Sequence, residues 1–419
     1  MNGSTALCLR HSGRLGTLGA PPSVETLILD PTTKSIVLPF AEPTRFTPGH
    51  LRQLLLSASS AGASDITIQT DSQPRIEIDG QLYRLGHRTW SASEVSAILC
   101  ELHHAPNAAA EIMGRRILDF SHEIATGAGR RQRFRINATG IHARDGFGIE
   151  ISIRVLPTKT PDLAFATLGP AEVAAMSPPS GLVLIAGSTG SGKSATMAAI
   201  TRHHLESTKR AVKIVDVQSP IEYNFHDVLR GETGLPSSIG QSEVGRHIPD
   251  FASGIWSALR RKPHIINVGE ARDLETISAA LEASLTGHLV YTTTHAGSVH
   301  DCIRRLLSAF PAKERDHRAS DLGISLRYIM VQHLVQRSDG MGRIPLREWL
   351  SFSGPVRESL LGLQPSRWPE FVHEIMTNKR FSPEGLRRTL RNSAQDLISR
   401  GLLSPDEASR KTGLSFNRD

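Results

Sequence analysis

Cysteine, aromatic residues and long apolar runs are all scarce in this chain of 419 residues. Its three cysteines, Cys8, Cys100 and Cys302, lie far apart and form no C-x-x-C pair, so the sequence indicates neither a disulfide framework nor a zinc knuckle. Aromatic residues make up 5% of the chain, which leaves few rings for stacking on nucleic-acid bases. Apolar runs such as residues 182–186 are far shorter than the roughly 20 residues that cross a bilayer. We therefore expect a protein of the reducing cytosol with no membrane-spanning segment.

Neither sign of charge dominates. The 48 Lys and Arg residues exceed the 41 Asp and Glu residues by a net charge of +7, and most of that surplus lies in residues 311–419. Such a segment is either an ordinary solvated surface or a docking surface for nucleic acid, anionic lipid or an acidic protein. With 39% hydrophobic residues, the chain is long enough for about two to three folded domains.

The N-terminal part of the chain predicts an arm followed by a small domain. Residues 1–46 are rich in Gly, Pro, Ser and Thr, so we expect a flexible arm with one short strand at TLILD and no secretory leader. Residues 47–157 predict an α+β domain with a helix ending near Gly62, alternating strands and a hairpin turn at Asp79-Gly80.

The remainder of the chain predicts an α/β domain. Residues 158–162, which follow Pro157 and contain Pro161, are a natural linker, since proline stiffens the chain and breaks strand pairing. Residues 163–419 then alternate apolar strands with helices and end in a helical C-terminal segment, in which Ser404 and Glu407 form a capping pattern. Continuous apolar strands such as LVLIA and KIVDV are typical of a parallel sheet covered on both faces.

The strongest motif is GSTGSGKS at residues 187–194, which lies between the strand LVLIA and a helical stretch. Its glycines let successive N–H groups turn toward phosphate oxygens at a helix N-terminus. Lys193 is expected to reach the β- and γ-phosphates of ATP, and Ser194 to bind Mg²⁺. The alternative is a glycine-rich turn without a ligand. The predicted nucleotide-binding residues are Gly187, Ser188, Thr189, Gly190, Ser191, Gly192, Lys193, Ser194 and Ala195.

Further polar residues follow the later strands. Glu270 in HIINVGEARD lies at the carboxyl end of a strand, where open α/β sheets bind ligands, so it can orient water or help to hold the metal. A purely structural carboxylate is the alternative, because Gly269 stands where such motifs usually carry aspartate. His288 and His295 flank the strand LVYTTT, and each is either structural or in contact with a terminal phosphate or a neighbouring subunit.

Several motifs together make the chain similar to a known superfamily. The chain resembles the secretion and pilus-retraction ATPases of the PilT superfamily. The segments that carry this resemblance are GASDITIQT, IEIDGQLYRL, RFRIN, GSTGSGKS, SPIEY, SALRRKPHIINVGEARDLETISAALEASLTGHLVYTTTH and RESLL. The resemblance is greatest to the DotB and TraJ branch of type IVB secretion and plasmid conjugation. It covers roughly residues 47–415 and is densest at residues 181–300.

The resemblance implies a PAS-like N-terminal domain followed by a RecA-like ATPase domain, with ATP and Mg²⁺ as cofactors. It implies a cytoplasmic homohexamer that associates peripherally with the inner membrane through the secretion or pilus machinery. No sequence-specific nucleic-acid binding is expected.

The resemblance also implies catalytic residues, namely arginine fingers at Arg133, Arg135 and Arg154 together with Glu270, Lys193 and His295. In RFRIN the two arginines alternate with Phe134 and Ile136, so both are predicted on one face of a strand. A solvated sheet face is the alternative explanation for these arginines.

One departure from the superfamily concerns hydrolysis. Gln218, two residues before Pro220, stands where a catalytic glutamate is expected. Glutamine can hold a water molecule but cannot accept its proton, so hydrolysis is expected to be slow unless another carboxylate substitutes. Asp216 faces the same side of the strand, and Glu222 and Glu270 remain in place.

Three functions follow from these observations. The first is a hexameric ATPase that energises type IVB secretion, conjugative transfer or pilus retraction. The second, motivated by Gln218, is a structural subunit that binds ATP with little hydrolysis. The third is a nucleic-acid motor, which the low aromatic content disfavours.

Overall fold

The computed structural model describes residues 28–30, 35–38, 40–78, 81–127, 130–229, 235–340, 342–377 and 386–416. It divides the chain into two compact units, Met1–Lys159 (unit 1) and Thr160–Asp419 (unit 2). The division falls inside the segment 158–162 expected to be a linker. The predicted Asp79-Gly80 turn and most of the predicted N-terminal arm lie outside the described residues.

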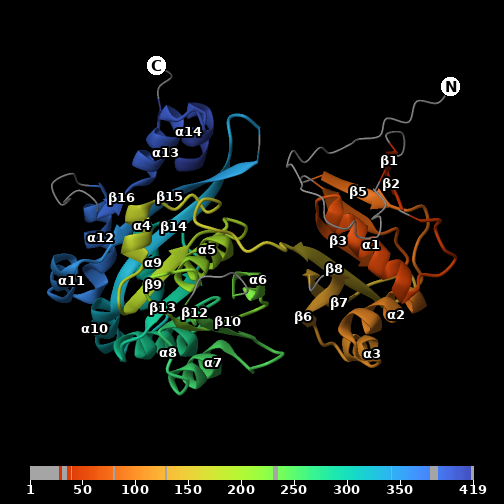
Figure 1. The fold of residues 1–419 in the computed structure, drawn as a ribbon, viewed down its shortest axis with the longest axis horizontal. Helices are drawn as coiled ribbons and strands as arrows, with labels where there is room; N and C mark the ends of the chain where they lie inside the picture. The colour runs from red at the N-terminus through yellow and green to blue at the C-terminus, as the bar shows by residue number, and fades with distance from the viewer. Residues whose placement is uncertain are drawn as a thin grey trace. The chain divides into compact units, whose positions relative to one another are not determined.

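Unit 1 is built on an eight-stranded sheet in the order β1-β2-β5-β4-β3-β8-β7-β6. Its neighbours are antiparallel apart from the parallel pair of β2 with β5. The strands are β1 (Ile28–Asp30), β2 (Ser35–Val37), β3 (Ala63–Gln69), β4 (Arg75–Ile78), β5 (Gln81–Leu85), β6 (Leu118–Gly127), β7 (Arg130–Ile141) and β8 (Gly148–Leu156). The helices are α1 (Pro48–Ser60), α2 (Ala92–His103) and α3 (Ala108–Met113). Figure 1 shows these helices beside one face of the sheet.

Period-two alternation decides which face of this sheet is buried. Ile66, Ile153 and Phe134 are fully buried and share one core with apolar residues of α1 and α2. Their neighbours in sequence, such as Asp65 and Arg154, lie on the opposite face, which is polar. As the sequence pattern predicts, α1 ends just before Gly62, whose φ of +79° suits a residue without a side chain.

Unit 2 contains a second eight-stranded sheet, in the order β11-β10-β12-β13-β9-β14-β15-β16. In this sheet order, each strand from β11 across to β14 is parallel to its neighbour. The pairs of β14 with β15 and of β15 with β16 are antiparallel. The strands are β9 (Gly181–Ala186), β10 (Lys213–Gln218), β11 (Ser238–Glu243), β12 (Ile265–Val268), β13 (Leu289–Thr294), β14 (Leu326–Gln336), β15 (Arg343–Ser351) and β16 (Arg387–Arg388).

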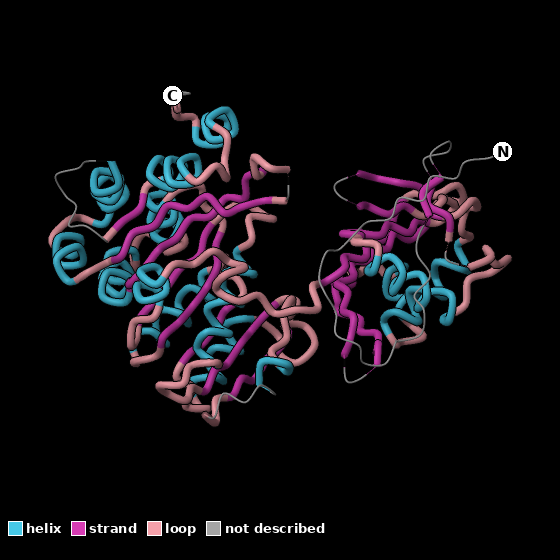
Figure 2. Tube along the Cα trace, turned by 45° about the horizontal axis from the view of Figure 1, so that its top comes forward, coloured by secondary structure: helices cyan, strands magenta, loops and turns pink. Residues whose placement is uncertain are grey.

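Helices cover both faces of this sheet, and Figure 2 shows the strands lying between them. One face packs on α4 (Pro170–Met176), α5 (Lys193–Leu205) and α6 (His226–Leu229) around one apolar core. The other packs on α7 (Phe251–Leu259), α8 (Leu274–Leu285), α9 (Val299–Ser308), α10 (Arg315–Ser325), α11 (Gly354–Leu361) and α12 (Trp368–Thr377) around a second core. Pro365–Arg367 is a short 3₁₀ turn between α11 and α12. The central strands β9, β12 and β13 are buried along their whole length, as expected for a covered parallel sheet.

The C-terminal segment differs from the helical one that we expected. It contains helices, including α13 (Leu390–Ser399) and α14 (Pro405–Thr412), but also the long antiparallel pair β14 and β15. The apolar run that forms β14 fits a buried strand or a buried helix equally well by periodicity, and pairing with β9 decides it. At α14, Ser404 accepts a hydrogen bond from the N–H of Glu407, so the cap lies where predicted. Within the described ranges, no helix is both long and apolar enough to span a bilayer.

Candidate functional site

The glycine-rich motif forms a loop between β9 and α5. Gly187, Gly190 and Gly192 have φ angles of +147°, +74° and +84°. A Cβ atom at Gly187 would lie 2.3 Å from the backbone oxygen of Gln332, so this position admits only glycine. The loop ends at the first turn of α5, which begins at Lys193. Backbone N–H groups gathered at a helix N-terminus form a phosphate-binding arrangement.

Lys193 closes this loop. Its ammonium Nζ donates to the backbone oxygens of Gly187 at 2.9 Å and Ser188 at 3.0 Å. Burial lowers the pKa of Lys193, and the carboxylates of Glu270 and Glu222 oppose that shift. Two acidic side chains thus act electrostatically on the lysine that is expected to bind phosphate.

The structure brings Glu270 and His295 together. They follow the neighbouring parallel strands β12 and β13, so both lie at the same edge of the sheet. His295 Nε2 lies 3.5 Å from Glu270 Oε1. The Thr293 hydroxyl donates to the Gly269 carbonyl at 2.6 Å and so ties the two strand ends together. By contrast, His288 precedes β13 at the opposite edge of the sheet, away from the phosphate loop, and its Nδ1 lies 3.1 Å from the Ala283 oxygen.

The half-buried Gln218 contacts the buried Asp216 at the end of β10. Asp216 is 2% exposed and accepts hydrogen bonds from Gln218 Nε2 at 2.6 Å and Gln241 Nε2 at 2.7 Å. Burial raises the pKa of Asp216, and the amide hydrogen bonds offset part of that shift. A Cβ at Gly269 would lie 2.7 Å from Gln218 Oε1. The glutamine therefore occupies the space beside Gly269, where related motifs carry an aspartate.

A small cavity of about 20 Å³ adjoins the start of α5 and the end of β10. Its lining includes Ser194, Asp216, Gln218 and Glu222. A hydroxyl and carboxylate oxygens are the hard donors that Mg²⁺ prefers, so this donor set fits the predicted metal. Among the described residues, no group of three or more His, Cys, Asp and Glu side chains is arranged to hold a metal ion.

The three predicted arginine fingers all lie on the polar face of the unit 1 sheet, and each contacts a carboxylate. Arg133 is buried and donates to Glu123 at 2.9 Å. Arg135 donates through two nitrogens to Asp119, at 3.2 and 2.8 Å, and Arg154 donates to Asp65 at 2.9 Å.

Arg135 pairs directly with Arg154 across β7 and β8. The side chains of these two arginines are 34% and 58% exposed, whereas that of Arg133 is 5% exposed. Arg135 and Arg154 are thus the more accessible of the predicted fingers.

Two buried polar residues beside the phosphate loop are not evident from the sequence motifs. Gln332 on β14 is 1% exposed and Arg347 on β15 is 4% exposed, and the two are joined by a hydrogen bond of 2.7 Å. Gln332 could have been predicted as a site residue because it is an amide within the mostly apolar run of β14, and a buried polar group needs specific hydrogen-bond partners.

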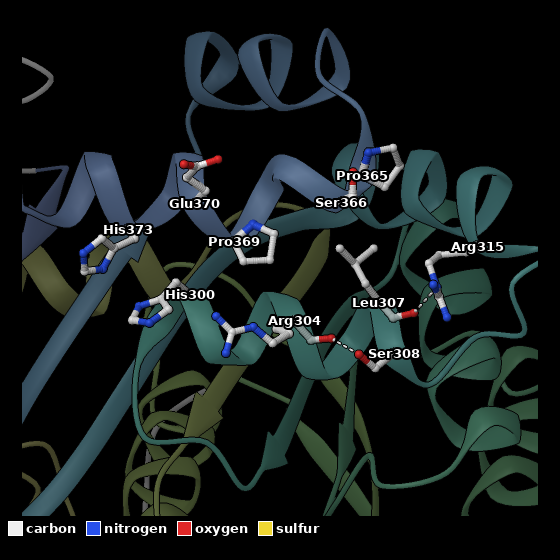
Figure 3. A pocket seen from close by; sticks show the side chains of 10 residues that line it. All are labelled: His300, Arg304, Leu307, Ser308, Arg315, Pro365, Ser366, Pro369, Glu370 and His373. Carbon is white, nitrogen blue, oxygen red and sulfur yellow. Dashed lines mark hydrogen bonds between the residues drawn. The ribbon is translucent and has the colours of Figure 1, made fainter.

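A second, larger cavity of about 570 Å³ lies between α9 and the segment from Pro365 through α12 (Figure 3). The rings of His300 and His373 meet edge to face there, with centroids 4.8 Å apart. The lining residues are His300, Arg304, Leu307, Ser308, Arg315, Pro365, Ser366, Pro369, Glu370 and His373. None of them belongs to the phosphate loop or the strand ends, so this cavity is separate from the candidate nucleotide site.

Known proteins with similar sequences and structures match this chain across both units. The family model described as "Type II/IV secretion system protein" matches residues 44–354. The chain is 31% identical over 369 residues to the type IV pilus retraction ATPase PilT of Pseudomonas aeruginosa, covering 88% of this chain and 99% of that protein. The crystal structure of the Legionella pneumophila ATPase DotB matches with a TM-score of 0.78 and 35% identity, over 89% of this chain and 98% of that one.

A structure of the pilus retraction motor PilT with bound ADP matches with a TM-score of 0.69 and 26% identity, over 86% of this chain and 96% of that one. These similarities confirm the predicted fold class, an α/β RecA-like ATPase domain preceded by a smaller N-terminal domain.

Proposed function

Because this chain belongs to the Type II/IV secretion system protein family, we propose that it is a Mg²⁺-dependent ATPase that drives a type IV secretion or pilus machine. The single observation that carries the proposal is the phosphate loop, whose Lys193 lies within the electrostatic reach of Glu270 and Glu222. Relatives named as a pilus retraction ATPase and a DotB ATPase support the ATPase activity, and the ADP-bound relative supports nucleotide binding.

Each part of the site has a separate task. The backbone N–H groups of the loop and the N-terminus of α5 bind the phosphates, and Lys193 exchanges its two carbonyl partners for phosphate oxygens. Ser194, with the carboxylates that line the adjoining cavity, would hold Mg²⁺, which neutralises charge on the phosphates. Glu270 orients the attacking water, and His295, 3.5 Å away, positions the Glu270 carboxylate.

Phosphate release from ATP by the purified chain tests the activity. Lys193→Ala removes the charge that binds the phosphates, so we expect turnover to fall by about 10²-fold or more. Lys209→Ala is the matched control, because Lys209 is an exposed lysine beyond the C-terminus of α5. Equal turnover in wild type and Lys193→Ala would contradict the proposal.

Glu270→Gln and Gln218→Glu separate the motor from a structural subunit. If Glu270 is the main water-orienting carboxylate, Glu270→Gln loses turnover by about 10²-fold while ADP affinity is unchanged. The alternative function, an ATP-binding subunit with little hydrolysis, is favoured by the hydrogen bond that holds Gln218 on Asp216. That alternative predicts negligible wild-type turnover, restored by Gln218→Glu.

We further propose a homohexameric ring in which unit 1 of one subunit supplies arginines to the nucleotide site of the next. Arg135 and Arg154 are the best candidates, since both are accessible and already bind carboxylate oxygens.

An experiment that mixes two inactive variants tests whether arginines act between subunits. Lys193→Ala retains intact arginines and Arg154→Gln retains an intact loop, so mixed rings should regain turnover that neither variant has alone. Additive rates in the mixture, or a monomer in light scattering, would contradict the ring.

Within the cell, we propose that the ring works in the cytoplasm at the inner membrane, held there by machine partners and without sequence-specific nucleic-acid binding. The relatives' names support a pilus or secretion machine. Turnover that does not change on addition of single- or double-stranded DNA is expected. DNA-stimulated turnover would favour the nucleic-acid motor instead.

A further inference from the structure

The side chain of Gln332 joins the phosphate loop to the helix that follows it. Its Nε2 donates to the backbone oxygen of Ser191 at 2.6 Å, and its Oε1 accepts from the Thr196 hydroxyl of α5 at 2.8 Å. β14 pairs with β9 in parallel, so Gln332 lies directly beside the start of the loop. A Cβ at Gly192 would lie 2.8 Å from Gln332 Nε2. The loop therefore packs closely on this one amide.

Arg347 extends these contacts away from the loop. It stands opposite Gln332 in the β14–β15 pair, and its Nε donates to Gln332 Oε1 at 2.7 Å. Its Nη1 donates to the backbone oxygen of Thr167 at 3.0 Å, and its Nη2 donates to the backbone oxygen of Ala166. A rigid guanidinium with five N–H donors suits such a branched contact.

Ala166 and Thr167 belong to the junction segment, residues 160–168, with which unit 2 begins after Lys159. The N–H groups of Ala166 and Leu168 donate to the oxygens of Asp162 and Leu163, so the segment forms compact turns. Its first residue, Thr160, accepts a hydrogen bond from Arg202 Nη1 of α5 at 2.9 Å. The segment is thus held against the nucleotide-binding part of unit 2 at both of its ends.

We propose that Gln332 and Arg347 form a hydrogen-bonded relay through which the phosphate loop and the junction segment hold each other in place. Gln332 is a positioning residue for the loop, and nucleotide binding at the loop is transmitted to the point at which the chain passes from unit 1 into unit 2. The second statement rests on the proposed nucleotide-binding function, whereas the first does not.

The relay has two arms: the loop arm is the contact of Gln332 with Ser191 and Thr196, and the junction arm is the contact of Arg347 with residues 166 and 167. Different substitutions remove the two arms separately. Gln332→Leu removes the contacts of the amide with Ser191, Thr196 and Arg347, so Arg347 keeps its contacts with the junction segment but loses its connection to the loop through Gln332. Gln332→Glu keeps oxygens that accept from Arg347 and Thr196 but loses the donor to Ser191, and it places a carboxylate beside that carbonyl. Arg347→Met keeps the loop arm and removes the junction arm. The matched control is Gln336→Leu, at the exposed end of the same strand.

Hydrogen–deuterium exchange of the full chain without nucleotide tests the relay. In Gln332→Leu, we expect exchange to accelerate about tenfold both in peptides covering 187–196 and in those covering 160–168, as loss of a buried hydrogen bond predicts. Gln332→Glu should accelerate only the loop peptides, and Arg347→Met mainly the junction peptides. If Arg347→Met does not fold, the two Gln332 variants still test the relay.

Two outcomes would overturn the relay. One is unchanged junction exchange in Gln332→Leu. The other is acceleration of the same size in Gln336→Leu or throughout unit 2, which would indicate general destabilisation.

Addition of ADP tests transmission. In wild type, ADP should slow exchange at both sites, whereas in Gln332→Leu it should bind about tenfold more weakly and, at saturation, protect only the loop. Equal protection of the junction segment in both proteins would refute transmission. If wild type binds no ADP, the proposed function and transmission both fail, while exchange without nucleotide still decides the positioning role of Gln332.

Discussion

At the scale of single residues, Glu348 is a buried acid whose ionisation opposes folding. It lies on β15, is 9% exposed, and its Oε1 accepts from the N–H of Val299 at 2.7 Å. Burial raises the pKa of Glu348 from 4.5 to about 7, although the Val299 hydrogen bond opposes the shift. Between pH 4.5 and 7, the unfolded chain therefore loses this proton while the folded chain keeps it. The contribution of Glu348 to stability falls as pH rises through this window.

Glu348→Gln should accordingly remove a pH-dependent penalty. The amide cannot ionise and still accepts from Val299, so we expect the stability of the variant relative to wild type to rise by about 3 kcal/mol from pH 4 to pH 8. Urea unfolding at both pH values measures the difference, with Glu358→Gln, an exposed acid, as the control. The same stability difference at both pH values would contradict the assigned ionisation.

At the scale of elements, the β14–β15 pair depends on the C-terminal helices. Val335, Ile344 and Leu346 near its end form a small core with Leu397 of α13 and Ala408 of α14. Figure 1 shows these two helices beside that end of the pair. Because β14 also carries Gln332, the helices cover part of the same strand that supports the phosphate loop.

Leu397→Ala should weaken this small core. The side chain is 5% exposed, and removing a buried leucine of this kind costs about 2–4 kcal/mol. Faster hydrogen exchange in peptides covering 333–346, compared with those of β12, is the expected readout. Gln395→Ala, an exposed position on the same helix, is the control. If both variants exchanged like wild type, the cluster would contribute little to stability.

At the scale of the whole molecule, each unit has its own core. One apolar cluster draws its residues from unit 1, and three others draw theirs from unit 2. The phosphate loop, Glu270 and His295 also belong to unit 2, whereas the predicted arginine fingers belong to unit 1. We therefore expect nucleotide binding to need unit 2 alone and full hydrolysis to need both units.

A fragment of residues 160–419 tests this division. We expect it to unfold cooperatively and to bind ADP within about threefold of the full chain, since its core and loop are retained. Turnover should fall by about 10²-fold or more if arginines of unit 1 act on the phosphates. Thermal unfolding, ADP titration and phosphate release measure the three properties. Full turnover by the fragment would exclude a catalytic role for Arg133, Arg135 and Arg154.

Local patterns were enough to predict much of this molecule. GSTGSGKS between an apolar strand and a helix predicts the phosphate loop, because its glycine conformations and helix start depend on neighbouring residues. Alternation likewise predicts the buried and polar faces of the unit 1 sheet, as Phe134 and Arg135 illustrate. The strands β12 and β13, which precede Glu270 and His295, are also evident from their apolar runs.

The phosphate loop is predictable from local information, because its pattern lies within eight residues. Contacts between residues far apart in the chain are visible only in the folded protein. The sequence did not reveal that Gln332 and Arg347, from distant strands, hold the loop, or that Gln218 lies beside Gly269. Such contacts depend on strand order and register, which arise from packing of the whole sheet rather than from local preference.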